Sequence, residues 1–128
     1  MEIATHLAID PTWSGRVTHL SEGKATVELV TLPAMGADEQ GLVHGGFVFS
    51  AADYAAMVAV NDPHVVLGAA ETRFLAPTRV GETVVLEAEI TARKGRKHTV
   101  AVRGRCGETD VFSGTFTAFV LDAHVLAE

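Results

Sequence analysis

Residues 41–62 read GLVHGGFVFSAADYAAMVAVND, and between His44 and Val60 nearly every residue is apolar or small. The alanines, Met and Phe favour an α-helix from about Gly45 to Val60. The Asn-Asp-Pro sequence that follows ends this helix, because proline cannot continue it. A helix that is apolar on all sides must be enclosed by other elements. The stretch therefore predicts a buried central helix around which the rest of the chain folds.

The segments on both sides of this helix have the pattern of β-strands. Residues 16–31 form two extended pieces around the turn Ser-Glu-Gly-Lys. After the helix come strand segments joined by turns, at 64–75, 83–93, 98–106 and 111–121. Short glycine-containing turns between the last three predict an antiparallel meander. We expect this sheet to curl around the helix.

The composition is that of one globular domain. The chain has 128 residues, of which 48% are hydrophobic and 20% charged, enough for a single core. Residues 1–14 carry little pattern and are expected to form a short helix or a loose arm. No apolar run is long enough to span a bilayer, because Asp53 and Asp62 interrupt the best candidate. The single cysteine, Cys106, and the absence of a signal-peptide pattern predict a cytoplasmic protein.

Charge is distributed unevenly along the chain. The formal net charge of −6 argues against nucleic-acid binding. Eight of the ten Lys and Arg residues lie between Arg73 and Arg105, and four form one basic turn: Arg93, Lys94, Arg96 and Lys97. This turn predicts either a site for a small anionic ligand or an ordinary solvated hairpin tip. The six histidines are scattered without paired ligand spacing, so no metal site is expected.

Asp53 is the one charged residue of the predicted helix. It shares a helix face with Ser50, three residues earlier. An ionised carboxylate on a buried helix is costly unless it is paired or hydrogen-bonded. Asp53 is therefore expected either to cap another segment or pair with an arginine at a subunit contact, or to take part in chemistry.

Gly45 and Gly46 lie where the helix is expected to begin. The first N–H groups of a helix have no partner within it, and the helix dipole adds positive charge there. Such an end suits an oxyanion, although a Gly-Gly pair also suits a plain tight loop. Eight residues place Asp53 about 12 Å along the axis from Gly45. One chain cannot readily bring both groups to one carbonyl, whereas two antiparallel helices about a two-fold axis can.

These residues resemble the hotdog-fold thioesterases, particularly the phenylacetate-pathway type. The segment HGGFVFSAAD places His44 and Asp53 at that group's spacing, and RFLAPTRVGE is similar to its strand and turn after the helix. The resemblance covers residues 15–121. It implies an α+β hotdog fold, with a curled antiparallel sheet around one long helix. It also implies homodimers that often pair into tetramers, and hydrolysis of acyl-CoA thioesters without a cofactor, CoA being part of the substrate.

The resemblance also implies roles for individual residues. Gly45 N–H would polarise the thioester carbonyl, with Gly46 beside it and His44 helping to position that end of the site. Asp53 of the partner subunit would act as nucleophile or as general base, and the match leaves both open. The basic turn would meet the CoA phosphates through Arg93, Lys94, Arg96 and Lys97. Arg103 and Arg105 are weaker candidates for the same role.

Two positions depart from the pattern of that family. Asp38 occupies a place where relatives often have Asn, and an ionised Asp cannot donate a hydrogen bond. Thr72 is the one hydroxyl near the place where some relatives use Ser or Thr after the helix. These departures leave open a hotdog protein that binds acyl-CoA without turnover, as a sensor or assembly module. A hotdog hydratase is disfavoured, because the Asp-x-Asn-Pro-x-His pattern is absent.

Overall fold

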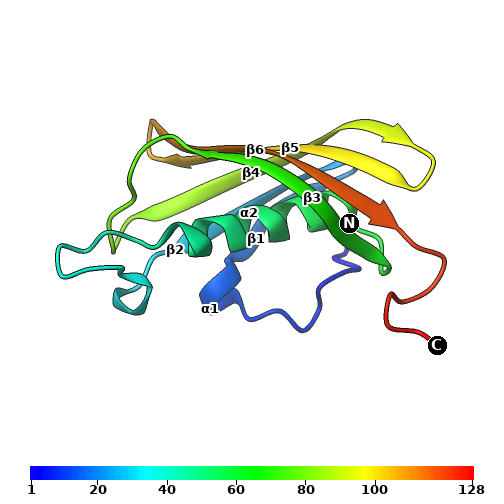
Figure 1. Ribbon diagram of the computed structural model, residues 1–128, viewed down its shortest axis with the longest axis horizontal. Helices are drawn as coiled ribbons and strands as arrows, with labels where there is room; N and C mark the ends of the chain where they lie inside the picture. Colours follow the sequence, from blue (N-terminus) through cyan, green and yellow to red (C-terminus); the bar gives the residue numbers. More distant parts are fainter.

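A six-stranded antiparallel sheet curls around one long helix, as the computed structural model of residues 1–128 shows (Figure 1). The elements are α1 (Pro11–Ser14), β1 (Arg16–Ser21), β2 (Lys24–Val30), a 3-10 turn (Pro33–Met35), α2 (Gly45–Val60), β3 (Val65–Phe74), β4 (Thr83–Lys94), β5 (Lys97–Cys106) and β6 (Thr109–Val120). The expected α+β architecture, with the sheet wrapped around the helix, is confirmed.

Helix α2 begins and ends where its sequence predicts. Asn61 caps its C-terminal end in the left-handed conformation, with φ of 54°, and donates its N–H to Met57 O at 2.8 Å. Asn is one of the few residues besides glycine that adopt this conformation readily. The alanines of α2 allow the strands to approach closely, and four are fully buried: Ala51, Ala52, Ala55 and Ala56.

The strand order is β1-β2-β4-β5-β6-β3, and every neighbouring pair is antiparallel. The predicted meander is therefore confirmed for β4, β5 and β6. Strand β3 precedes the meander in the sequence but pairs only with β6, so it forms one edge of the sheet. Its outer edge has no partner within the chain.

The core lies between the concave face of the sheet and α2. Alternate residues of β2, β4 and β5 are buried on this face, and the largest fully buried side chains include Leu29, Leu86, Phe112 and Phe116. Burying a side chain of this size stabilises the fold by about 1.5–3 kcal/mol. The two phenylalanines pack with ring centroids 6.3 Å apart. Phe116 also packs on Phe49 of α2, with ring centroids 5.6 Å apart, so aromatic packing holds β6 against the helix.

The segment before β1 lies along α2. Of the two expectations for residues 1–14, the short helix is present as α1, which Asp10 caps by accepting from Thr12 N at 2.9 Å. Thr5 and Ser14 are buried. Figure 1 shows this segment, in blue, on the side of α2 away from the sheet. No helix of this fold has both the length and the apolar character that a membrane crossing requires.

Candidate active site

The first turn of α2 is held in place by the loop before it. Val43 donates its N–H to Thr78 O, and His44 donates its N–H to Met35 O, both at 2.9 Å. His44 is the N-cap residue, in the extended conformation, and its side chain caps nothing. The start of the helix at Gly45 is therefore fixed by backbone hydrogen bonds alone.

Close packing explains why positions 45 and 46 are both glycine. A Cβ on Gly45 would lie 3.0 Å from Cε1 of Phe74, and one on Gly46 would lie 2.8 Å from Nε2 of His44. The Phe74 ring thus packs against the helix start, and the His44 imidazole folds back over the first turn. There it meets Phe47 edge-on, with ring centroids 6.0 Å apart. The two glycines allow two aromatic rings to border this end of the helix.

Two backbone donors are free at this end. Neither Gly45 nor Gly46 donates its N–H to any acceptor, and Phe47 is the first residue whose N–H is used, bonding His44 O at 3.1 Å. Unpaired N–H groups at the positive end of a helix are ready donors to an oxygen that gains negative charge. This end of α2 can therefore polarise a carbonyl group.

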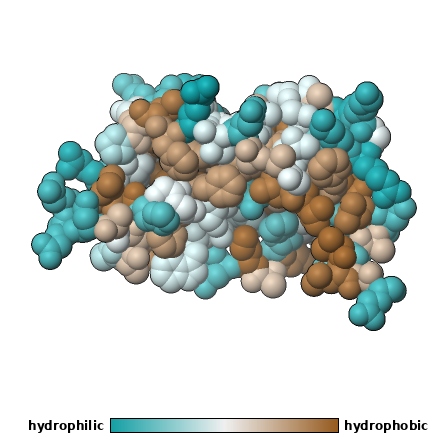
Figure 2. Space-filling model, viewed as in Figure 1, coloured by the Kyte–Doolittle hydropathy of each residue, from teal (hydrophilic) through white to brown (hydrophobic).

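A mostly apolar hollow of about 370 Å³ lies beside Gly45. It is lined by Leu42, Val43, Gly45, Val48, Phe74, Leu75, Ala76, Pro77, Thr78 and Val111. Phe74 and Leu75 are more than half exposed despite their size. Figure 2 shows apolar side chains running across the middle of one face of the molecule. The free amides thus lie next to surface suited to an apolar group.

Asp53 lies eight residues further along α2 and has no partner. Its Oδ1 is buried without a hydrogen bond, and no basic side chain forms an ion pair with it. Burial raises the pKa of Asp53 from its ordinary value of 3.8 to about 6. Within the chain, Asp53 neither caps a segment nor pairs with an arginine. A desolvated, unpaired carboxylate of this kind is suited to accept a proton or to attack a carbonyl.

The structure does not bring Gly45 and Asp53 of one chain together. Both lie on the same straight helix, about 12 Å apart along its axis. A nucleophile or its water must come within about 3–3.5 Å of the carbon whose oxygen the amides hold. Each chain therefore presents the two groups at separate points.

The basic turn lies at the opposite end of the molecule from Gly45. It forms the tip of the β4–β5 hairpin, where Lys94 pairs with Lys97. Arg96 O accepts from Val120 N at 2.9 Å, and Val120 pairs with Val65, the first residue of β3. Since β3 starts a few residues after α2 ends, the tip lies toward the C-terminal end of α2.

The four cations of the tip differ in their contacts. All four are exposed. Arg96 forms an ion pair with Asp122 in the C-terminal segment. Arg93, Lys94 and Lys97 form no ion pair. Three positive charges are therefore available to an anionic ligand.

Asp38 and Thr72 lie apart from each other. Asp38 is in the exposed loop before α2, where its Oδ1 accepts from Gln40 N at 2.9 Å and Leu42 N at 3.3 Å. Its carboxylate therefore holds its own loop. Thr72 is partly buried on β3, opposite Gly114 of β6.

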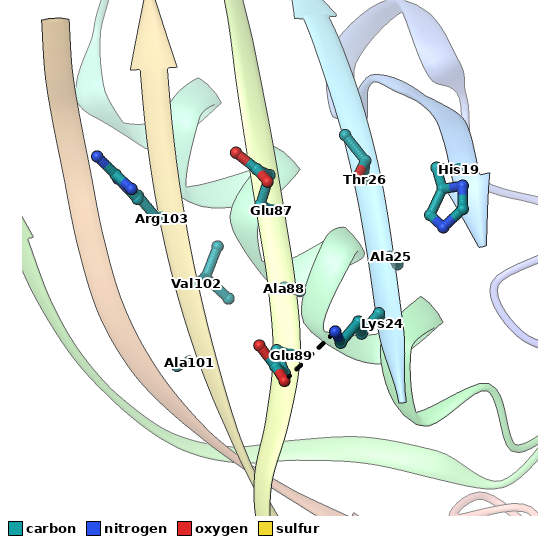
Figure 3. Close-up of a pocket in the computed structure, with 10 residues that line it drawn as sticks. All are labelled: His19, Lys24, Ala25, Thr26, Glu87, Ala88, Glu89, Ala101, Val102 and Arg103. Carbon is teal, nitrogen blue, oxygen red and sulfur yellow. Dashed lines mark ion pairs between the residues drawn. The ribbon is translucent and has the colours of Figure 1, made fainter. Parts of the chain in front are cut away.

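The outer face of the sheet carries charged residues, several of which form ion pairs with one another. Figure 3 shows a hollow of about 400 Å³ there, with α2 behind the strands and Lys24 paired to Glu89 at 3.7 Å. Beside it, Arg103 bonds Asp110 with Nε at 2.9 Å, and Arg105 lies 3.6 Å from the same oxygen. Asp110 thus engages both arginines that the sequence offered as weaker phosphate ligands. No group of three or more metal-ligating side chains lies close enough together to hold a metal ion.

Sequence reasoning missed the contacts that residues 1–14 make with α2. Ser14 Oγ lies 3.0 Å from Ser50 Oγ, and the His6 ring lies against Tyr54 with centroids 6.2 Å apart. Both helix residues are close to Asp53 in the sequence. Asp10 followed by Pro11 is a typical helix start and signals α1. Nothing in the local sequence marks His6.

Comparison with known families identifies one match. The family model described as the thioesterase superfamily matches residues 40–113, which include Gly45, Asp53 and the basic turn. This range covers more than half of the chain, from the loop before α2 into β6.

Two curated relatives are larger proteins. The chain is 49% identical over 123 residues to methylthioribose-1-phosphate isomerase from Aquifex aeolicus, covering 95% of this chain and 27% of that protein. It is 29% identical over 85 residues to the transcription factor FapR from Caldanaerobacter subterraneus, covering 66% of this chain and 42% of that protein. The chain thus spans less than half the length of either relative.

Solved structures match over nearly the full chain. An uncharacterized protein from Pyrococcus horikoshii has a TM-score of 0.98 at 46% identity, covering 99% of this chain and 98% of that one. A variant of the phenylacetic acid degradation protein PaaI from Thermus thermophilus has a TM-score of 0.78 at 27% identity, covering 85% and 95%. A hypothetical thioesterase from Streptococcus pneumoniae, solved with coenzyme A, has a TM-score of 0.76 at 17% identity, covering 85% and 87%. The last of these shows the shared fold alone.

Proposed function

The chain belongs to the thioesterase superfamily, and we propose that it hydrolyses an acyl-CoA thioester to a free acid and CoA in a site shared by two protomers. The observation that carries this proposal is Asp53, a partly buried carboxylate on a mostly apolar helix, whose Oδ1 is buried without a hydrogen-bond partner. Leaving such a group unpaired costs free energy of folding, and a reaction that needs a base is a reason to keep it.

The amide end of α2 acts on the carbonyl. The free N–H groups of Gly45 and Gly46 hydrogen-bond the thioester oxygen and stabilise the negative charge that develops on it. The apolar hollow beside Gly45 contacts the organic part of the substrate. The His44 ring, which lies over Gly46, helps to position the substrate at this end of the site.

Asp53 of the partner subunit acts on the reacting carbon. As a general base it takes a proton from water while the water oxygen bonds to the carbonyl carbon; the C–S bond then breaks and the CoA sulfur takes up a proton. As a nucleophile its oxygen displaces CoA to give a mixed anhydride, which water hydrolyses to the acid. Label found in the Asp53 carboxylate after a single turnover in ¹⁸O-labelled water would establish the nucleophile, since a general base itself never acquires label.

The unpaired edge of β3 supports the shared site. This edge lacks the lysine or proline that protects many edge strands, and its middle residues, Gly68, Ala69 and Ala70, are small and exposed. Antiparallel pairing of two β3 edges about a two-fold axis would continue the sheet through the dimer. The two α2 helices would then run antiparallel on one side of it. Gly45 of one chain can approach Asp53 of the partner subunit in that arrangement.

The basic tip supports CoA as the carrier. In each chain the tip lies toward the C-terminal end of α2, and Asp53 is nearer to that end than Gly45 is. Asp53 and the tip of one chain would thus serve the same site. Arg93, Lys94 and Lys97 are free to meet nucleotide phosphates. The fold accommodates coenzyme A in the Streptococcus pneumoniae protein.

The test is hydrolysis of a panel of acyl-CoA esters by the wild type and by Asp53→Asn, with binding measured in parallel. Asn keeps the shape of the side chain and removes the base. We expect a loss of about a hundredfold or more in kcat with little change in affinity. Equal rates in both proteins would contradict the role of Asp53.

A second candidate is binding of acyl-CoA without turnover. It is favoured by Asp38, where catalytic relatives often have Asn, and by the similarity to a protein named as a transcription factor. Binding of CoA esters without hydrolysis of any member of the panel would establish it. The unpaired Asp53 favours hydrolysis, because a binding protein gains nothing from burying that charge.

A further inference from the structure

Residues 2–14 form an arm that follows α2 from its first turn to its last. Trp13 lies against Phe47, with ring centroids 5.9 Å apart. The other contacts follow along the helix: Ser14 with Ser50, His6 with Tyr54, and Asn61 with Glu2 and Ala4. The two Asn61 hydrogen bonds, to Ala4 N at 2.7 Å and Glu2 O at 2.9 Å, fix the far end of the arm. The arm therefore runs antiparallel to α2 along its length.

All these contacts lie on one side of Asp53. At about 100° per residue, Ser50 and Tyr54 lie about 60° and 100° around the helix from Asp53 in the same direction. Phe49 lies about 40° around in the other direction, and it packs on Phe116 of β6 with ring centroids 5.6 Å apart. Asp53 thus lies between two walls, one made by the arm and one made by Phe49, which packs on the fully buried Phe116.

The arm wall is most constrained at His6. This residue has φ of 54°, a left-handed conformation that few residues other than Gly adopt and in which Asn, Asp and His are the most frequent of them. Thr5, which is 4% exposed, lies beside it, and its Oγ1 is 2.8 Å from His6 Nδ1. The ring on the other side is Tyr54, which is 7% exposed. Such strain persists where surrounding contacts hold it, and it gathers at functional positions. Burial also lowers the pKa of His6, which favours the neutral ring.

We propose that the arm is a specificity wall of the acyl site, in which the His6 ring against Tyr54 blocks long acyl chains from crossing α2 beside Asp53. Compact acyl groups fit between the two walls, and long chains meet the rings. This inference rests on the proposed function for the position of the acyl group. It adds which acyl groups are accepted and which residue excludes the rest.

The test compares His6→Gly and His6→Asn with the wild type. Gly and Asn both tolerate the left-handed conformation, so these variants remove the ring and keep the backbone path of the arm. Leu7→Ala is the matched control, because Leu7 is the next residue and its side chain is 77% exposed. Thermal melting of each variant reports on folding.

The readouts are kcat/KM for butanoyl-CoA and dodecanoyl-CoA, and the dissociation constants of the S-butyl and S-dodecyl thioethers of CoA, which cannot be hydrolysed. The wild type is expected to prefer the short group. His6→Gly and His6→Asn are expected to shift the preference toward the long chain by about tenfold or more, with the short chain little affected. Leu7→Ala is expected to leave the preference unchanged.

The two proposals fail differently. Absence of hydrolysis together with a shifted thioether preference would contradict the thioesterase activity and support the wall. A wild type that prefers the long chain, or an unchanged preference in both His6 variants, would overturn the wall even if hydrolysis is normal. Binding of neither thioether by the wild type would overturn both.

Discussion

The residues of the candidate site show how one motif serves two purposes. Gly45 and Gly46 leave room for the rings of Phe74 and His44, and they also leave their own N–H groups open to a ligand. Sequence reasoning found the glycines and Asp53, because Gly-Gly at a helix start and a lone carboxylate on an apolar helix are rare combinations. It could not find the packing of Phe74 on Gly45, because these residues are far apart in the chain and meet only in the fold.

Removing the Gly45 amide tests its role directly. Proline is favoured at the first position of a helix, and His44 before it has φ of −63° and ψ of 127°, which suits a residue preceding proline. Gly45→Pro therefore deletes the N–H with little change to the backbone. We expect kcat for the best acyl-CoA to fall by about a hundredfold or more.

Gly45→Ala is the control for this substitution. It brings a similar Cβ toward Phe74 but keeps the N–H. A small effect of Ala beside a large effect of Pro assigns the loss to the amide. Equal losses would show that the added carbon, and not the missing donor, causes the defect.

The raised pKa of Asp53 predicts a cost to stability at neutral pH. The folded protein holds the proton more tightly than the unfolded chain, so stability falls as pH rises from 3.8 to about 6 and stays lower above it. The full shift corresponds to about 3 kcal/mol, which partial solvent contact reduces to about 1–2 kcal/mol. Asp53→Asn is therefore expected to be more stable than the wild type at pH 8 by about that amount.

Urea unfolding at one protomer concentration and two pH values checks this expectation. At pH 4 the advantage of Asp53→Asn should largely disappear, because the wild-type carboxyl is then mostly protonated when folded. A variant less stable than the wild type at pH 8 would mean that Asp53 makes a favourable contact in the native protein.

The elements were largely predictable from local patterns. The bounds of α2 and the meander of β4, β5 and β6 follow from apolar periodicity and turn residues. The position of β3 at the sheet edge does not, because pairing between β3 and β6 joins segments separated by two other strands. The course of residues 1–14 along α2 was also hidden, since its contacts are single side chains such as His6 and Ser14.

The cations at the basic tip of the β4–β5 hairpin are expected to act together on a ligand. Replacing Arg93, Lys94 and Lys97 with Gln removes the three charges that have no ion pair and leaves the Arg96–Asp122 pair in place. We expect the dissociation constant of CoA to rise by about tenfold and its dependence on salt to weaken. Arg16→Gln, an exposed cation on β1, is the control and should change little. Unchanged CoA affinity in the triple variant would make the tip a plain solvated hairpin.

For the whole molecule, the central feature is that one chain presents the free amides and Asp53 at separate points. The free amides lie at one end of α2, and Asp53 lies about 12 Å away along the same axis. The number of residues between them and the geometry of a helix predict this separation, and both residues lie within the one continuous helix α2. How two chains pair depends on the β3 edge and the surfaces beside it, which local sequence patterns do not specify.

Mixing two inactive variants tests the shared site most directly. Asp53→Asn and Gly45→Pro are each expected to be inactive. They are unfolded together and refolded at equal concentration, so that about half of the dimers contain one chain of each kind. Each mixed dimer would have one site with both substitutions and one with neither, so the mixture should recover about a quarter of wild-type activity. Mixed dimers that form and remain as inactive as the parents would show that each site is built within one chain.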